Sequence, residues 1–127
     1  MTAQPNDALR ILEIYRQVAE TRDRIKAFGL TQNMFYEPAP DVRTRALMDM
    51  VFMPVYRVCE ETSNLSYEVA RSHPEIPWDQ IRGMRNRMAH AYFTFEPRFL
   101  WDVVQNDFPA LEKLCRDYAT AHNLELL

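Results

Sequence analysis

Residues 78–92 read WDQIRGMRNRMAHAY, and the apolar side chains of this stretch recur at helical spacing. On a helical wheel that advances about 100° per residue, four apolar side chains fall within one arc. They are Ile81, Met84, Met88 and Ala91. Polar side chains at i, i+4 and i+8 form a stripe on the opposite side, made of Arg82, Asn86 and His90. The stretch therefore predicts an amphipathic helix with one face turned to a core.

A first helix is predicted upstream. Asn6 or Asp7 can cap its start, and Gly29 favours a stop just after Phe28. The sequence EPAP at residues 37–40 then takes the chain out of helical geometry, because a residue that precedes proline avoids the helical region.

A long second helix is predicted from Asp41, which can cap it, to about Ser72. Pro54 lies inside it and is predicted to kink it, because proline lacks the backbone N–H of a helix interior. One face of this helix is apolar. Its residues are Val51, Val55, Val58, Thr62, Leu65 and Val69.

Two helices are predicted downstream. Pro97 fits the first turn of a short helix that runs through Val104, and Asp107 with Pro109 opens a last helix that ends near His122. The pattern is helical throughout, so the 127 residues predict one all-α domain, a bundle of four to five helices.

Composition narrows the class of protein. No run of about 18 apolar residues is present, and the first residues lack the layout of a signal peptide. Cys59 and Cys115 lack C-x-x-C spacing, which favours two small buried residues in a reducing cytoplasm. His73 and His122 are predicted to be isolated and exposed, and the zinc and di-iron motifs are missing, so no metal or cofactor is expected.

The charge of residues 80–95 departs from the rest of the chain. This stretch carries Arg82, Arg85, Arg87 and His90 and no carboxylate, although the formal net charge of the chain is −3. Arginine binds phosphate oxygens through a planar fork, and histidine transfers protons near neutral pH. The bland alternatives are a solvated helix face or ion pairs between subunits, and the residues alone do not decide between them.

Spacing along this helix argues for a site shared between two chains. Asn86 can reach His90, but Arg85 and His90 are five residues apart and lie about 140° from each other on a straight helix. Arg85 instead shares an edge with Tyr92. A single phosphate can therefore meet Arg85 and His90 only at a distorted helix end or beside a second copy of the helix.

Arg85, Asn86, His90 and Tyr92 together give the pattern R-N-x-x-x-H-x-Y, which resembles the signature of the HepT-like HEPN ribonuclease toxins. The resemblance covers roughly residues 41–115 and is strongest over 76–93, IPWDQIRGMRNRMAHAYF. It extends to Trp101-Asp102-Val103, to DFPAL at 107–111, to Val58-Cys59-Glu60 and to Leu65-Ser66. Cys59, where the family usually has glycine, and Pro54 depart from its pattern, and both concern helix packing rather than chemistry.

The resemblance implies a HEPN-like homodimer that cleaves RNA without a metal at a groove built by both chains, with assembly beyond a dimer left open. Arg85 would stabilise the charge of the reacting phosphate, His90 would act as general acid or base, and Asn86 would orient His90 or hold a phosphate oxygen. Arg82 and Arg87 would bind RNA. Whether that RNA is transfer RNA or messenger RNA is left open.

The family also implies a partner. It pairs such toxins with a minimal nucleotidyltransferase antitoxin of the MNT type, which transfers AMP to the tyrosine of the motif, here Tyr92. From the residues alone, Tyr92 is equally well explained as an aromatic side chain at the edge of the core. Two other functions are compatible with the sequence. One is a non-catalytic helical module that docks and regulates a nucleotidyltransferase, and the other is a simple nucleic-acid binder. The acidic net charge disfavours the binder.

Overall fold

The computed structural model describes residues 5–126, except for the side chains of Pro5 and Tyr92. Within that range the chain is helical, with no strand, which confirms the predicted all-α class. The helices are α1 (Pro5–Ala27), α2 (Gln32–Tyr36), α3 (Val42–Ser63), α4 (Tyr67–Ser72), α5 (Trp78–His90), α6 (Arg98–Asn106) and α7 (Phe108–His122). A 3-10 turn, η1 (Tyr92–Thr94), follows α5.

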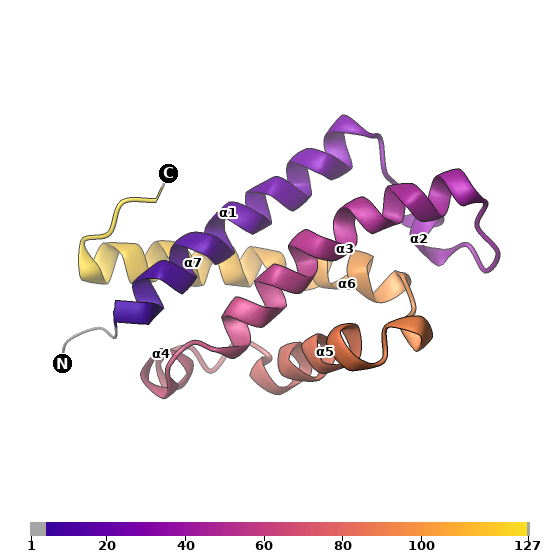
Figure 1. The fold of residues 1–127 in the computed structure, drawn as a ribbon. Helices are drawn as coiled ribbons and strands as arrows, with labels where there is room; N and C mark the ends of the chain where they lie inside the picture. The colour runs from indigo at the N-terminus through magenta and orange to yellow at the C-terminus, as the bar shows by residue number, and fades with distance from the viewer. Residues whose placement is uncertain (1–4, 127) are drawn as a thin grey trace.

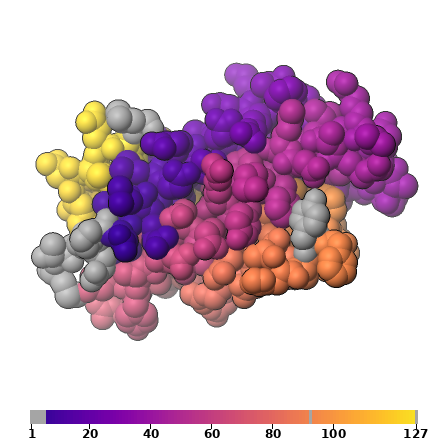
Figure 2. Space-filling view, viewed as in Figure 1, coloured from indigo at the N-terminus to yellow at the C-terminus, as the bar shows by residue number. Residues whose placement is uncertain are grey.

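Helix α3 lies at the centre of the arrangement. It contacts α1 on one side and α5 on the other, while α7 packs against α1 and α6 (Figure 1). In the same view, the surface of α3 forms a band between α1 and the segment that holds α5 (Figure 2). The position of α5 is therefore set mainly by its contact with α3.

The core consists of the apolar faces that the sequence pattern predicts. Fully buried side chains from α1, α3 and α7 meet between the helices, and each such side chain contributes roughly 1.5–3 kcal/mol through burial. They include Ile11, Ile14, Val51, Val55, Val58, Phe108, Leu111 and Leu114. All six residues predicted for the apolar face of residues 41–72 are buried.

The predicted second helix is divided in the structure. α3 ends at Ser63, and Ser66 caps a separate helix, α4, by accepting a hydrogen bond from the N–H of Val69. Asp7 stabilises this break. Its buried carboxylate accepts hydrogen bonds from the N–H and from the hydroxyl of Ser66, at 2.9 and 2.6 Å. The prediction of one continuous helix to Ser72 was therefore wrong.

The same contact corrects the predicted start of the first helix. α1 begins at Pro5, so Asn6 and Asp7 lie inside it, and the Asp7 carboxylate serves α4 instead of capping its own helix. The predicted stop is confirmed, because Gly29 adopts a left-handed φ of 61°. The short α2 was not predicted.

Helix α3 begins and continues as its sequence requires. Asp41 caps it as predicted, accepting from the N–H of Thr44 at 2.8 Å. The helix continues through Pro54, whose missing N–H leaves the carbonyl of Met50 without its intrahelical donor. The guanidinium of Arg24 on α1 donates to this carbonyl at 2.8 Å, so the proline is accommodated by a contact from a neighbouring helix. None of the described helices is both long and apolar enough to cross a bilayer.

The contact between Asp7 and Ser66 yields a stability prediction. Asp7→Ala removes the buried acceptor of two partly buried donors of Ser66, and we expect it to lower the free energy of unfolding by about 1–2 kcal/mol. The measurement is urea denaturation followed by circular dichroism. Asp41→Ala is the control, and we expect a smaller loss because the N–H that it frees is exposed to water. Equal losses from both variants would contradict this account.

Candidate active site

Helix α5 forms as predicted and is anchored at its start. Its buried face consists of Ile81, Met84 and Met88, which pack towards α3. The indole N–H of Trp78 donates to the carbonyl of His73 at 2.9 Å, which fixes the first turn. These contacts hold the opposite face of the helix towards solvent.

The helix ends at His90, two residues earlier than predicted. Ala91 leaves helical geometry with φ −132° and ψ 40°, although its N–H still donates to the carbonyl of Arg87 at 2.9 Å. Tyr92 then begins η1, so Tyr92 and Arg85 do not share one helix edge as the wheel predicts. The side chain of Tyr92 lies outside the described part of the structure.

The polar stripe is exposed as predicted. Arg82, Asn86 and His90 all face solvent. Arg82 forms an ion pair of 3.3 Å with Asp79 one turn earlier. Among the described residues, neither Asn86 nor His90 forms a hydrogen bond, and His90 has no ion pair or ring contact. The His90 imidazole is therefore open to a ligand or a partner chain.

Arg85 lies on a different side of α5. Its guanidinium faces α3, where its Nε lies 3.4 Å from an Oε2 atom of Glu60. Both side chains are half-buried, and both of these atoms are inaccessible to solvent. One chain thus brings Arg85 to a carboxylate and leaves His90 on the solvent face.

Arg87 takes part in a cationic cluster that the sequence did not predict. Its guanidinium lies 5.2 Å from the centre of the Phe99 ring on α6, and the guanidinium of Arg98 lies 5.1 Å from the same ring. Contacts between cations and aromatic rings at this range are attractive. Arg98 follows a loop and has no periodic relation to α5, so only the fold could reveal the cluster.

The cysteines do not contribute a nucleophile. Cys59 and Cys115 are buried, as predicted. Burial raises the pKa of each thiol to about 12. The thiolate, which is the reactive form of cysteine, is therefore suppressed near neutral pH.

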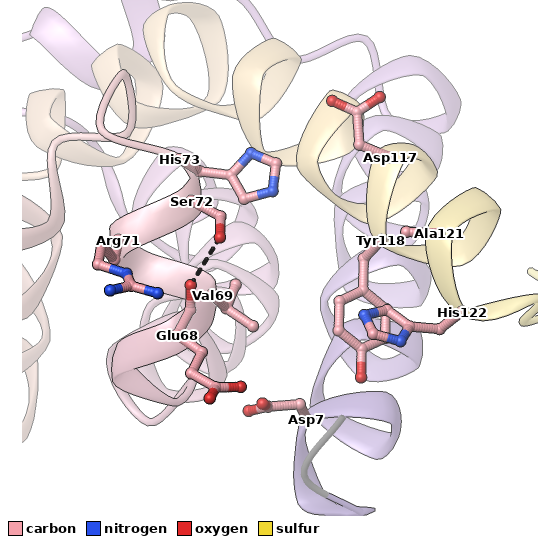
Figure 3. Close-up of a pocket in the computed structure, with 10 residues that line it drawn as sticks. All are labelled: Asp7, Glu68, Val69, Arg71, Ser72, His73, Asp117, Tyr118, Ala121 and His122. Atoms are coloured by element: carbon pink, nitrogen blue, oxygen red, sulfur yellow. Dashed lines mark hydrogen bonds between the residues drawn. The ribbon is translucent and has the colours of Figure 1, made fainter. Parts of the chain in front are cut away.

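The other two histidines line a pocket between α4 and α7 (Figure 3). His73 is half-buried and lies 3.2 Å from Glu75, and the His122 ring packs 4.1 Å from the ring of Tyr118. Both histidines were predicted to be isolated and exposed. His122 is exposed as predicted, but His73 is not, and each histidine has a side-chain neighbour. Among the described residues, no three side chains of the metal-binding types are grouped to hold an ion.

Comparison with known proteins places the chain in a family. The family model described as "Ribonuclease HepT-like" matches residues 11–118, which is most of the chain. The chain belongs to the HepT-like ribonuclease family. The resemblance seen in the sequence is thereby confirmed.

Individual relatives match over shorter stretches. "Probable ribonuclease HepT" of Thermococcus cleftensis is 42% identical over 53 residues, 42% of this chain and 48% of that protein. "Putative RNase TTE0752" of Caldanaerobacter subterraneus is 34% identical over 58 residues, which are 46% of this chain and 52% of that protein. The chain thus spans about half the length of these curated relatives. No solved structure matches it.

Gly83 gives a prediction about the exposed face of α5. It lies in the middle of the helix, and a Cβ added there would meet nothing within 4 Å. Because glycine costs a helix interior roughly 0.5–1 kcal/mol relative to alanine, we expect Gly83→Ala to stabilise the free protein by about that amount. Thermal unfolding measures this. A destabilised variant would show that α5 is constrained at Gly83 within the single chain.

Proposed function

We propose that the protein is a metal-independent endoribonuclease whose active site forms where the α5 helices of two copies meet. The observation that carries the proposal is the separation of Arg85 and His90 within one chain, because Arg85 faces α3 and His90 faces solvent. Two copies related by a twofold axis can place Arg85 of one chain beside His90 of the other. Membership of the HepT-like ribonuclease family supports RNA as the substrate.

The chemistry needs one proton-transfer group and one fixed cation. The 2′-hydroxyl oxygen attacks the adjacent phosphorus, and the bond from phosphorus to the 5′-oxygen breaks. The products are a cyclic phosphate and a 5′-hydroxyl. Because DNA lacks the attacking 2′-hydroxyl, RNA and not DNA would be cleaved. His90 acts in one of the two proton transfers, either from the 2′-hydroxyl or to the leaving oxygen. Arg85 stabilises the charge that develops on the phosphate, while Asn86 orients His90 or a phosphate oxygen.

An exposed aromatic side chain beside α5 supports a second copy as the partner. Phe93, three residues after His90, is 88% exposed. Large apolar side chains that are left open next to a cationic site are typical of surfaces that another molecule covers. Arg82 and Arg87 are exposed on α5 and would contact the RNA backbone.

The first test is RNA cleavage by purified protein in EDTA, with the intact mass of each sample recorded. We expect cleavage by the unmodified wild type. His90→Ala should lose about 10²–10⁴-fold in rate, as for other general acids and bases. Arg85→Ala should lose about 10²–10³-fold. His122→Ala and Arg22→Ala are matched controls, because they alter an exposed histidine and an interhelix ion pair elsewhere.

Two outcomes would contradict the proposal. Cleavage that survives His90→Ala would remove His90 from the mechanism. Absence of cleavage by protein of unmodified mass would favour a non-catalytic module that docks a nucleotidyltransferase. The shared site has its own test, since a mixture of Arg85→Ala and His90→Ala chains should recover activity that neither variant has alone. No recovery on mixing would contradict an active site built by two chains.

The proposal extends to a toxin of the cytoplasm that a nucleotidyltransferase antitoxin silences at Tyr92. The phenol oxygen of Tyr92 would attack the α-phosphorus of ATP, and pyrophosphate would leave. The phosphodiester formed in this way adds negative charge close to His90 along the chain and competes with RNA phosphates for the arginines.

Mass spectrometry after incubation with the cognate nucleotidyltransferase and ATP tests this step. We expect the added mass of AMP on the wild type, its loss in Tyr92→Phe and a fall in ribonuclease activity in proportion to labelling. Tyr67→Phe is the control, because Tyr67 is 78% exposed and would be labelled if exposure alone selected the tyrosine. Labelling that persists in Tyr92→Phe would refute the assignment.

A further inference from the structure

Two adjacent glutamates of α3 form ion pairs with arginines on opposite neighbours. Glu61 accepts from Arg10 of α1 at 2.9 Å, and Glu60 lies 3.4 Å from Arg85 of α5. Successive side chains of a helix point about 100° apart, so neighbouring residues can serve two different interfaces. The pair to α1 contains no group of the candidate active site, whereas the pair to α5 contains its proposed cation.

The Glu60 carboxylate has a polar neighbour at each of its oxygens. Oε2 forms an ion pair of 3.4 Å with the Nε of Arg85; both atoms are inaccessible to solvent, and among the described residues neither forms a hydrogen bond. Oε1 accepts from the side-chain amide of Asn64 at 3.2 Å, and the same amide donates to the backbone carbonyl of Glu60 at 2.9 Å. Asn64 is the C-cap residue that follows α3, so the cap of this helix contacts the carboxylate.

Arg85 keeps most of its donors free in this arrangement. Only its Nε faces Glu60, and in the described part of the structure neither Nη atom forms a hydrogen bond. The Nη atoms carry four N–H groups, which suit the bidentate recognition of phosphate oxygens. An arginine that is held at Nε loses rotamer freedom before RNA arrives, and less ordering then remains to be done in the transition state.

We propose that Glu60 is a positioning residue, which holds Arg85 by its Nε and presents the two Nη atoms to the reacting phosphate. This inference rests on the proposed ribonuclease function. It assigns Glu60 a role through Arg85 and no contact with RNA. In this account activity requires α5 to pack on α3, because the carboxylate that orients the arginine belongs to the other helix.

The test compares Glu60→Gln with Glu61→Gln. Both substitutions keep the shape of the side chain and remove one interhelix ion pair of similar exposure, so both should lower the unfolding temperature to a similar extent. Only Glu60→Gln should lower kcat for RNA cleavage, by about 10- to 100-fold, as for a misplaced catalytic group. KM should change by less than about twofold, because the lost effect arises mainly in the transition state. Equal kcat values for the two variants would overturn the proposal.

A double-mutant cycle locates the effect at Arg85. Lysine lacks the planar guanidinium group that Glu60 would orient through Nε. In the Arg85→Lys background, Glu60→Gln should therefore lower kcat little further. Losses that multiply in the double variant would show that Glu60 acts independently of Arg85, which would also overturn the proposal.

A third measurement does not depend on catalysis. In ¹⁵N NMR relaxation, the Arg85 Nε–H signal, assigned from its absence in Arg85→Lys, should be rigid in the wild type and in Glu61→Gln and mobile in Glu60→Gln. A mobile signal in the wild type would refute the positioning role even if RNA is cleaved. A rigid signal in a wild type that cleaves no RNA would instead refute the proposed function and leave the Glu60 contact as a restraint on Arg85.

Discussion

Helix α3 packs between α1 and α5, and these two interfaces set the position of the helix that carries the candidate site. Apolar side chains of α3 are buried against both neighbours, and its two adjacent glutamates pair with an arginine on each side. Helix α5 has a single buried face, and its main packing partner is α3, so α3 determines where α5 lies. The placement of every polar group on α5 follows from this single interface.

The helical repeat then separates the two groups to which we assign the proposed chemistry. Five residues of helix turn Arg85 towards α3 and His90 towards solvent. The helix ends before Ala91, so Tyr92 lies in the following 3-10 turn and belongs neither to the face of Arg85 nor to the face of His90. A single chain therefore does not bring together the two groups of the proposed active site, and the proposed function needs a second copy of α5.

Local patterns in the sequence predicted what depends on neighbouring residues. The exposed stripe of α5, the cap at Asp41 and the left-handed stop at Gly29 all follow from spacing or from the chemistry of one residue. Features that join distant segments could not be predicted in this way. The break before α4 depends on Asp7, which lies 59 residues from Ser66. The contact between Glu60 and Arg85 likewise exists only once α3 and α5 have packed.

The cations around the candidate site are all arginines, and this has a consequence for regulation. The chain has only two lysines, Lys26 at the end of α1 and Lys113 on α7, and neither lies on α5 or α6. Guanidinium groups stay protonated at every pH at which proteins remain folded, and lysine acetylation does not act on them. Lysine acetylation therefore cannot remove the positive charge of this surface, whereas a negatively charged group added beside it would oppose that charge.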